Sequence, residues 1–485
     1  MRNFSFLILA SALLVNACGR SGEVFENATC IQHITTIDPQ EGPKEDQTVV
    51  IRDGRIVRVG SSEEIQLASS NTIVDGKGKY LIPGLWDAHV HFAYMPELAP
   101  RMFDLFMLYG ITSVRDTGGE IKFISKWRED SRANPTGAPR VMIAGPLLDG
   151  VPTVYDGTPG HPALGWGSAS VDEVARKVEI MDSAKVDLLK AYEMLTPEQF
   201  YKIMELAKAK NYIVTGHVPL TMDVITASNA GLTSMEHMRN LELSCASNAD
   251  ELLKQRLDML AKGKSMPGGD LRSSIHAAQR EIAVKNYDDN KANEILKVLL
   301  KNQTWQIPTL ALNTSQTRMP YPRPEWKESF SYLPDSTRFG WMSVIERSAM
   351  NGFPPFRLEY SKWMLMMAKK IYDAGIPMMA GTDTPIAFLT PGLSLHEELV
   401  VMTEAGIPPL EAIKTATINP AKYFHMENEL GSIKENQWAD LLILNGNPLE
   451  DIRNTQAIFA VIKQGKVYGQ NELEEIRKRL RGGQQ

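Results

Sequence analysis

The chain has 485 residues, of which 43% are hydrophobic and 23% are charged, and its formal net charge is -6. This length exceeds the usual size of one domain, so we expect one large domain and one smaller domain. The apolar fraction is that of a soluble globular protein, and the acidic charge balance argues against a nucleic-acid partner, which normally requires a basic surface.

The first 17 residues are predicted to be a signal peptide. Arg2 supplies a positive charge, and residues 4–15 form an apolar run that is shorter than the roughly 20 residues of a membrane span. The stretch Leu14-Val-Asn-Ala-Cys18 resembles the lipobox of bacterial lipoproteins. It predicts export to the cell envelope or periplasm, with a lipid anchor on Cys18 as the membrane contact. The alternative is ordinary cleavage nearby and a soluble exported protein.

The two ends of the mature chain have the pattern of short strands. Residues 48–60 form two β-branched runs joined by Asp53-Gly54, which is a strong hairpin signal. Residues 439–445 begin a second pair of strands near the other end. We therefore predict a small β-sandwich built from residues 23–82 together with residues 426–470.

Residues 83–425 alternate short apolar runs with helical stretches, which is typical of a parallel sheet. Eight strand–helix units need about 250 residues, so we predict an α/β fold, a (β/α)8 TIM-like barrel, with insertions at about 243–290 and 314–360. The second insertion is rich in aromatic residues and suits a lid. The predicted strands include residues 111–114, 140–144, 186–189, 213–215, 307–312 and 377–380, and the predicted helices include residues 172–184, 197–210 and 393–405.

Four histidines and one aspartate occupy the positions that a metal site needs. His89 and His91 are separated by one residue, and such residues on a strand point to the same side, so both imidazoles can reach one metal ion. His217, His237 and Asp383 each close a further predicted strand, on the face where barrel active sites are built. Imidazoles and a carboxylate suit Zn²⁺ or a similar divalent ion.

Lys190 ends the apolar run that begins at Val186. Burial of an ammonium group lowers its pKa. A neutral amine can capture CO2 and form a carbamate, an anionic oxygen ligand that can bridge two cations. The alternative is a surface lysine whose stem lies along apolar surface. The accompanying histidines favour the carbamate.

Cys30 and Cys245 remain in the mature chain. An oxidising compartment permits a disulfide, but Cys30 lies in an early strand and Cys245 far along the chain, so two separate thiols fit better. Neither cysteine lies in a motif that would lower its pKa and make it catalytic.

Six short stretches form a recognisable pattern over about residues 24–468. They are Leu81–His91, Gly110–Asp116, Met235–His237, Gly381–Asp383, Ala416–Ala421 and Ala439–Leu441. The chain resembles the amidohydrolase superfamily, in particular its binuclear branch related to imidazolonepropionase-like hydrolases and metal-dependent Xaa-Pro dipeptidases.

The resemblance implies two divalent metal ions, with zinc as the first choice, held by six protein ligands. These are His89, His91 and Asp383 on one ion, His217 and His237 on the other, and carboxylated Lys190 as the bridge. Two cations lower the pKa of a bridging water, giving hydroxide that attacks a substrate carbonyl. Asp383 would take the proton and pass it to the leaving nitrogen.

Three further residues are candidate substrate contacts. Tyr192 and Arg239 directly follow expected ligands, and Arg239 could pair with a substrate carboxylate or simply begin a helix. His161, on a loop after the third strand, could bind a carbonyl oxygen or substrate, or have a purely structural role. Arg115 and Asp116 also end a strand and are expected to form a buried structural pair.

We therefore predict a metal-dependent hydrolase that cleaves a carbon–nitrogen bond in a small peptide or N-acyl amino acid, as a dipeptidase or carboxypeptidase would. A deaminase or imidazolone-type cyclic-amide hydrolase is the enzymatic alternative, but those relatives typically bind one metal ion and lack the lysine. A non-enzymatic envelope binding lipoprotein would tolerate loss of ligands, and here all six positions are filled. The sequence does not indicate the oligomeric state.

Overall fold

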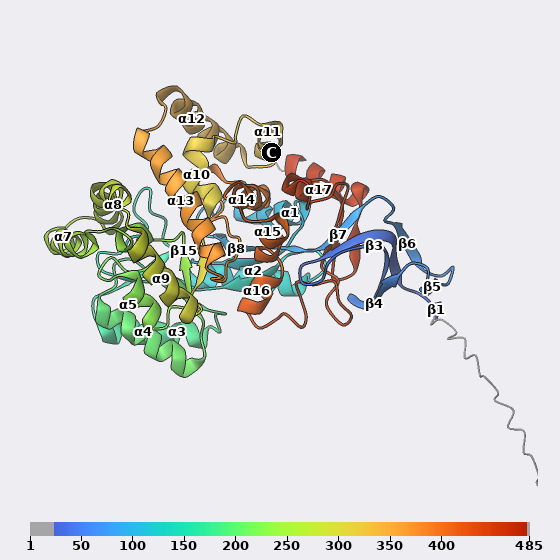
Figure 1. Ribbon diagram of the computed structural model, residues 1–485, viewed down its shortest axis with the longest axis horizontal. Helices are drawn as coiled ribbons and strands as arrows, with labels where there is room; N and C mark the ends of the chain where they lie inside the picture. Colours follow the sequence, from blue (N-terminus) through green and yellow to red (C-terminus); the bar gives the residue numbers. More distant parts are fainter. Residues whose placement is uncertain (1–23, 483–485) are drawn as a thin grey trace, which may run out of the picture.

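The computed structural model describes residues 24–482 (Figure 1). The predicted signal peptide, residues 1–17, and Cys18 lie outside the described residues. Cys30 and Cys245 are both buried free thiols, which confirms the expectation of two separate cysteines. Between residues 24 and 482, none of the helices has the length and apolar character that crossing a membrane requires.

A mixed sheet draws its strands from both ends of the described chain. Its members are β2 (Thr29–Asp38), β3 (Gly42–Arg52), β4 (Arg55–Ser61), β6 (Thr72–Asp75), β7 (Tyr80–Pro83), β17 (Leu441–Leu444), β18 (Ile458–Lys463) and β19 (Lys466–Tyr468). The order is β19-β18-β17-β7-β2-β3-β4, and β6 pairs with β2. Antiparallel pairing of β7 with β17, with Ile82 opposite Leu442, joins the two ends. The predicted hairpin is confirmed, because β3 and β4 pair around Asp53 and Gly54, whose φ angles are 52° and 78°.

Each face of this sheet has its own apolar cluster, since successive side chains of a strand point to opposite faces. On one face, Ile31 packs with Val49 and Leu441. On the other, Cys30 packs with Phe25, which belongs to a two-stranded sheet of β1 (Val24–Phe25) and β5 (Gln66–Leu67). The small sheet therefore covers part of the second face of the large one.

The middle of the chain contains parallel strands, as the alternating pattern predicts. They are β8 (Leu85–Val90), β9 (Ile111–Asp116), β10 (Arg140–Ile143), β11 (Leu147–Gly150), β12 (Gly165–Ser168), β13 (Leu189–Ala191), β14 (Val214–Gly216), β15 (Ser234–Glu236) and β16 (Trp305–Ile307). They form two parallel groups, β10-β9-β8 and β12-β11-β13-β14-β15-β16. Asp187 N–H donates to the carbonyl oxygen of Ile143 at 2.9 Å and links the groups. At the other end, parallel bridges join Met378 to Gln306 and Thr384 to Val90.

Helices follow these strands, so the α/β class is confirmed. They include α1 (Ala99–Leu108), α2 (Ile121–Ala133), α3 (Val171–Ser183), α4 (Pro197–Lys210), α5 (Val224–Asn229), α9 (Asp289–Lys301), α13 (Pro355–Asp373), α14 (Leu393–Glu404), α15 (Pro409–Thr415), α16 (Ile418–Tyr423) and the C-terminal α17 (Gln470–Gly482). The predicted helices match α3, α4 and α14 to within one residue. Helix α4 begins at Pro197 because the preceding Thr196 forms a capping box with Gln199 in the first turn.

Two helical insertions depart from simple strand–helix alternation. The first contains α6 (Leu241–Ser244), α7 (Ala249–Lys262) and α8 (Gly268–Lys285). The second contains α10 (Leu310–Arg318), α11 (Pro324–Phe330) and α12 (Asp335–Asn351). In Figure 1, α7 and α8 lie on the left, away from the blue strands of the mixed sheet on the right.

The predicted strand over residues 307–312 is wrong in its second half. Strand β16 ends at Ile307 and α10 begins at Leu310, because Thr309 adopts a left-handed conformation with φ 45°. The buried carboxylate of Glu398 accepts hydrogen bonds from the N–H groups of Leu310 and Ala311, which fixes the start of this helix.

Candidate metal centre and active site

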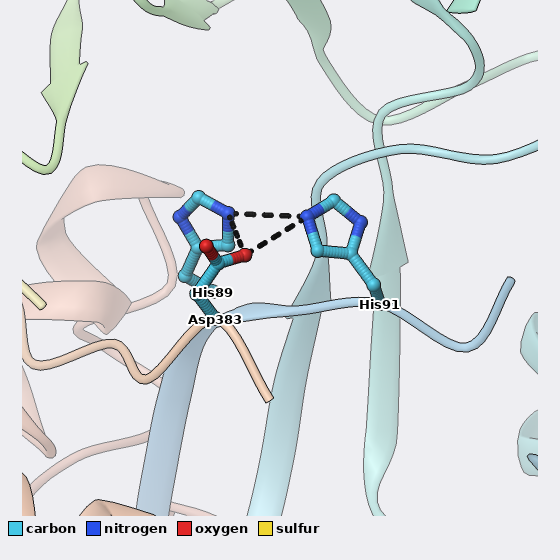
Figure 2. A group of neighbouring side chains, drawn as sticks. All are labelled: His89, His91 and Asp383. Atoms are coloured by element: carbon cyan, nitrogen blue, oxygen red, sulfur yellow. Dashed lines mark hydrogen bonds and ion pairs between the residues drawn. The ribbon is translucent and has the colours of Figure 1, made fainter. Parts of the chain in front are cut away.

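Three of the predicted ligands form a compact cluster at the end of β8 (Figure 2). The Nε2 atoms of His89 and His91 lie 3.3 Å apart, and each is 3.1 Å from Oδ1 of Asp383. All three residues are buried. The arrangement brings together two imidazole nitrogens and one carboxylate oxygen, which is a donor set suited to a divalent cation.

Backbone contacts hold Asp383 against β8. Its N–H donates to the carbonyl oxygen of His89 at 2.7 Å, and its φ is 64°. The preceding Thr382 donates to the buried carboxylate of Asp87 from its backbone N–H at 3.1 Å and from its hydroxyl at 2.7 Å. A non-glycine residue in the left-handed region is uncommon and is often found at functional sites.

The Nδ1 atoms of His89 and His91 contact groups that can only accept hydrogen bonds. Nδ1 of His89 lies 2.6 Å from the carboxylate of Glu236, and Nδ1 of His91 lies 3.2 Å from the carbonyl oxygen of Gly118. Each Nδ1 therefore carries the hydrogen, and each Nε2 presents a lone pair. Contacts of this kind orient metal-binding histidines.

The same reasoning applies to His217 and His237, which directly follow β14 and β15. Nδ1 of His217 lies 2.6 Å from the carboxylate of Glu193. Nδ1 of His237 lies 2.7 Å from the hydroxyl of Thr309, which itself donates to the carbonyl oxygen of Pro308 and so accepts from the ring. Burial lowers the pKa of His217 to about 3, so its ring is neutral at pH 7.

Lys190, at the centre of β13, lies beside this group. It is 1% exposed, and its Nζ is 3.3 Å from Nε2 of His89. Burial lowers the pKa of Lys190 to about 8, although Glu236 and Asp383 act in the opposite direction. A substantial fraction of Lys190 therefore carries a neutral amine near pH 8. The neutral amine is the form that reacts with CO2.

Five of the six predicted ligands line one cavity of about 120 Å³, and the sixth, His89, contacts Lys190 and Asp383 of its wall. His89 and His237 have ring centroids 4.7 Å apart, His237 and His217 4.9 Å, and Nε2 of His237 is 3.7 Å from Oδ2 of Asp383. Besides five of the six ligands, its walls include Tyr155, Tyr192, Arg239 and Arg272.

Unpaired acceptors show that a cation fits this site. Among the described residues, Nε2 of His217 and Oδ1 of Asp383 are buried and have no hydrogen-bond donor. Oδ1 of Asp383 also faces the Nε2 lone pairs of His89 and His91 at 3.1 Å, a repulsive arrangement that a positive ion reverses. Imidazole and carboxylate ligands suit zinc and related ions.

Two buried glutamates connect the histidines to the rest of the fold. Glu236 accepts from His89 and Thr215, and it pairs with Arg115 at 2.6 Å. Burial alone would raise the pKa of Glu236, but Arg115 and His89 hold it well below its usual range. The expected Arg115–Asp116 pair is therefore wrong, since Asp116 instead accepts from the backbone N–H groups of Phe92 and Gly118.

Glu193 has the same role for His217. Its two oxygens lie 2.6 Å from Nδ1 of His217 and 2.6 Å from Nε2 of His276. Burial would raise the pKa of Glu193, but His276 and Arg272 help to hold it well below its usual range. His276 and Arg272 belong to α8, so the first insertion reaches the candidate site.

The candidate substrate residues are placed differently from one another. Tyr192 and Arg239 line the cavity, and the Tyr192 ring lies 4.4 Å from that of His217. His161 is not one of the described residues that line the cavity; its ring lies 6.1 Å from that of Tyr155. Sequence reasoning missed Arg272, which lines the cavity from α8.

Comparisons with known proteins find amidohydrolases. Residues 325–469 match the amidohydrolase family model. The chain is 25% identical to ochratoxinase of Aspergillus niger, over 89% of this chain and 84% of that protein, and 24% identical to imidazolonepropionase of Streptococcus pyogenes, over 87% and 90%. It also superposes on the crystal structure of an Xaa-Pro dipeptidase with bound methionine, with a TM-score of 0.64 and 20% identity, covering 91% of this chain and 100% of that chain.

Residues 325–469 thus carry an amidohydrolase-family segment, and the similarity over most of the chain to these relatives is consistent with the amidohydrolase superfamily. The chain is an enzyme of the class that hydrolyses carbon–nitrogen bonds.

Proposed function

We propose that this enzyme is a binuclear metal hydrolase acting on a small peptide or an N-acyl amino acid. The observation that carries the proposal is a group of four oriented imidazoles, one carboxylate and one buried lysine, of which all but His89 line a single cavity and His89 contacts its wall. His89, His91 and Asp383 would hold one ion, and His217 and His237 the other. Carboxylated Lys190 would lie between them, and zinc fits the donor set.

We also propose that the chain forms a barrel domain and a smaller sandwich domain. The parallel strands from β8 to residues 377–384 would form a (β/α)8 barrel within residues 83–425, because their pairings lead back to β8 through the bridge between Thr384 and Val90. The mixed sheet and the small β1–β5 sheet would form a separate β-sandwich domain of residues 23–82 and 426–470.

When bound, divalent ions of this kind lower the pKa of water and polarise a carbonyl group. The carboxylate of Asp383 lies at the cavity wall, where it can accept the proton of the attacking water and deliver it to the leaving nitrogen. Glu236 and Glu193 keep His89 and His217 in the tautomer that directs Nε2 into the site. Tyr192 and Arg239 line the same cavity and would contact the substrate there.

The proposed substrate class is inferred from the size and charge of the cavity and from the similar proteins. A volume of about 120 Å³ suits a small substrate, and two arginines on the wall suit a negatively charged group. The similarity to ochratoxinase and the Xaa-Pro dipeptidase supports amide or peptide hydrolysis. Similarity to imidazolonepropionase favours the second candidate, cyclic-amide hydrolysis, but the buried Lys190 beside His89 favours the binuclear form.

A screen of dipeptides, N-acyl amino acids and imidazolone-type cyclic amides against the metal-loaded chain tests this assignment. We expect turnover of linear amides, and loss of turnover in Lys190→Ala but not in the control Lys208→Ala, which alters an exposed lysine of α4. Turnover restricted to cyclic amides, or full activity in Lys190→Ala, would contradict the proposal.

We also propose that the enzyme is exported and anchored through Cys18. Replacement of Cys18 by Ala is then expected to release the protein from the membrane fraction or leave it unprocessed. Recovery of the unaltered protein from the soluble periplasmic fraction would contradict the anchor.

A further inference from the structure

Arg272 reaches the active-site cavity from outside the strand–helix framework. It belongs to α8 of the first insertion, and it lines the cavity together with Arg239, His217 and Asp383. Its side chain is 19% exposed, and that of Arg239 is 15% exposed. Two guanidinium groups are thus largely withdrawn from water beside the proposed ligands.

The positive charges of Arg239 and Arg272 are not balanced by the carboxylate that pairs with them. Glu193 is 3.6 Å from Nη1 of Arg272 and 3.7 Å from Nε of Arg239, and among the described residues no other carboxylate forms an ion pair with either. Both oxygens of Glu193 also accept hydrogen bonds from His217 and His276. One carboxylate therefore faces two guanidinium groups, and one positive charge is left over in a place where water is scarce.

The two arginines also keep unused hydrogen-bond donors. The Nε atoms of Arg239 and Arg272 are buried and have no acceptor among the described residues. Arg272 itself is held in place, because its Nη1 donates to the hydroxyl of Tyr192 at 3.2 Å and its guanidinium carbon lies 5.9 Å from the Tyr155 ring centre. A fixed guanidinium with free donors is suited to a carboxylate.

We propose that Arg272, together with Arg239, binds the free carboxylate of the substrate and is the main specificity determinant of the enzyme. This inference rests on the proposed hydrolase function and narrows it to substrates whose scissile amide is followed by one amino acid with a terminal carboxylate. The cavity volume of about 120 Å³ suits a short substrate. The anion restores the charge balance on the cavity wall and accepts from the unused donors.

Paired substrates that differ only in this charge test the inference. For the best linear substrate of the screen and its C-terminal amide, kcat/KM is measured in the full metal-loaded chain, in Arg272→Met and Arg272→Lys, and in the control Lys285→Met. Lys285 is an exposed residue of the same helix and pairs with Glu281. Binding of L-leucine and L-leucinamide is followed by ligand-observed NMR, and metal content is determined for every variant.

We expect the unaltered chain to prefer the carboxylate. Arg272→Met should lose about 10- to 100-fold in kcat/KM for the carboxylate substrate, mainly through KM, since one charge-assisted hydrogen-bonding group is removed. For the amide substrate the loss should be clearly smaller, Lys285→Met should behave like the unaltered chain with both substrates, and Arg272→Lys should retain part of the preference for the carboxylate. An unchanged preference in folded, metal-loaded Arg272→Met would overturn the inference.

Failure of the carboxylate subsite and failure of the hydrolase assignment would give different results. If no amide is hydrolysed but L-leucine still binds in an Arg272-dependent manner, the hydrolase assignment fails and the carboxylate subsite stands. If carboxylate and amide substrates are hydrolysed equally well by the unaltered chain, the subsite fails and the hydrolase assignment stands.

Discussion

Glu193 lies 2.6 Å from Nδ1 of His217, and both residues are buried. The second oxygen of the same carboxylate lies 2.6 Å from Nε2 of His276 on α8. The helical insertion is therefore connected to a proposed metal ligand through a single side chain. If His217 holds a metal ion as proposed, metal retention should depend on residues that do not touch the metal.

Replacement of Glu193 by Gln should weaken metal binding without unfolding the protein. The amide has nearly the same shape, but it loses the negative charge and places an N–H₂ group against one of the two histidines. Loss of such an outer contact typically costs about 10- to 100-fold in metal affinity. Competition with a chelator measures the change, and the exposed Glu251→Gln variant of α7 is the control. Equal affinity in Glu193→Gln and the control would refute this role.

Asp383→Asn should separate metal binding from turnover. The amide keeps an oxygen near His89 and His91 but removes the charge and the proton acceptor. Proton transfer by a placed side chain contributes about 10²–10⁴-fold to rate, so we expect kcat to fall by at least that factor in protein reconstituted with excess metal. The exposed Asp373→Asn variant is the control. Near-normal kcat in fully metallated Asp383→Asn would exclude Asp383 as the proton carrier.

His396 should make stability depend on pH below neutrality. It is buried on α14, and its Nε2 donates to the carbonyl oxygen of Tyr109 at 2.9 Å. Burial lowers the pKa of His396 from 6.5 to about 4. The unfolded chain therefore binds a proton first as the pH falls, so stability is fully present above pH 6.5 and is lost between pH 6.5 and about 4, by about 3 kcal/mol in total.

The His396→Gln variant checks this prediction by urea unfolding at several pH values. Gln does not titrate, so the free energy of unfolding should fall less steeply between pH 6.5 and 4 than in the unaltered chain. The difference between the two slopes isolates His396 from the other buried histidines. Parallel slopes would show that His396 does not contribute.

Much of this site could be predicted from the sequence because its ligands follow apolar strands. His89, His217 and Asp383 stand where local patterns end, and parallel strands bring such ends together. Glu236 could have been found from its place next to His237. Arg272 and His276 could not, because they lie on an inserted helix whose position depends on tertiary packing rather than on a strand pattern.

The predicted strand over residues 307–312 is wrong in its second half for a similar reason. The run is apolar throughout, and periodicity alone does not distinguish a short buried strand from the start of a buried helix. The break comes from the left-handed Thr309 and from Glu398, which is 88 residues from Leu310 in the chain. A long-range contact of this kind leaves no local signal.

The number of metal ions per chain tests the central claim most directly. Elemental analysis of protein purified without chelator should approach two equivalents of a divalent metal. Lys190→Ala, which removes the proposed bridge, should retain no more than one equivalent and lose activity, whereas Lys208→Ala should retain two. One equivalent in a fully active unaltered chain, or two equivalents in Lys190→Ala, would contradict the binuclear account.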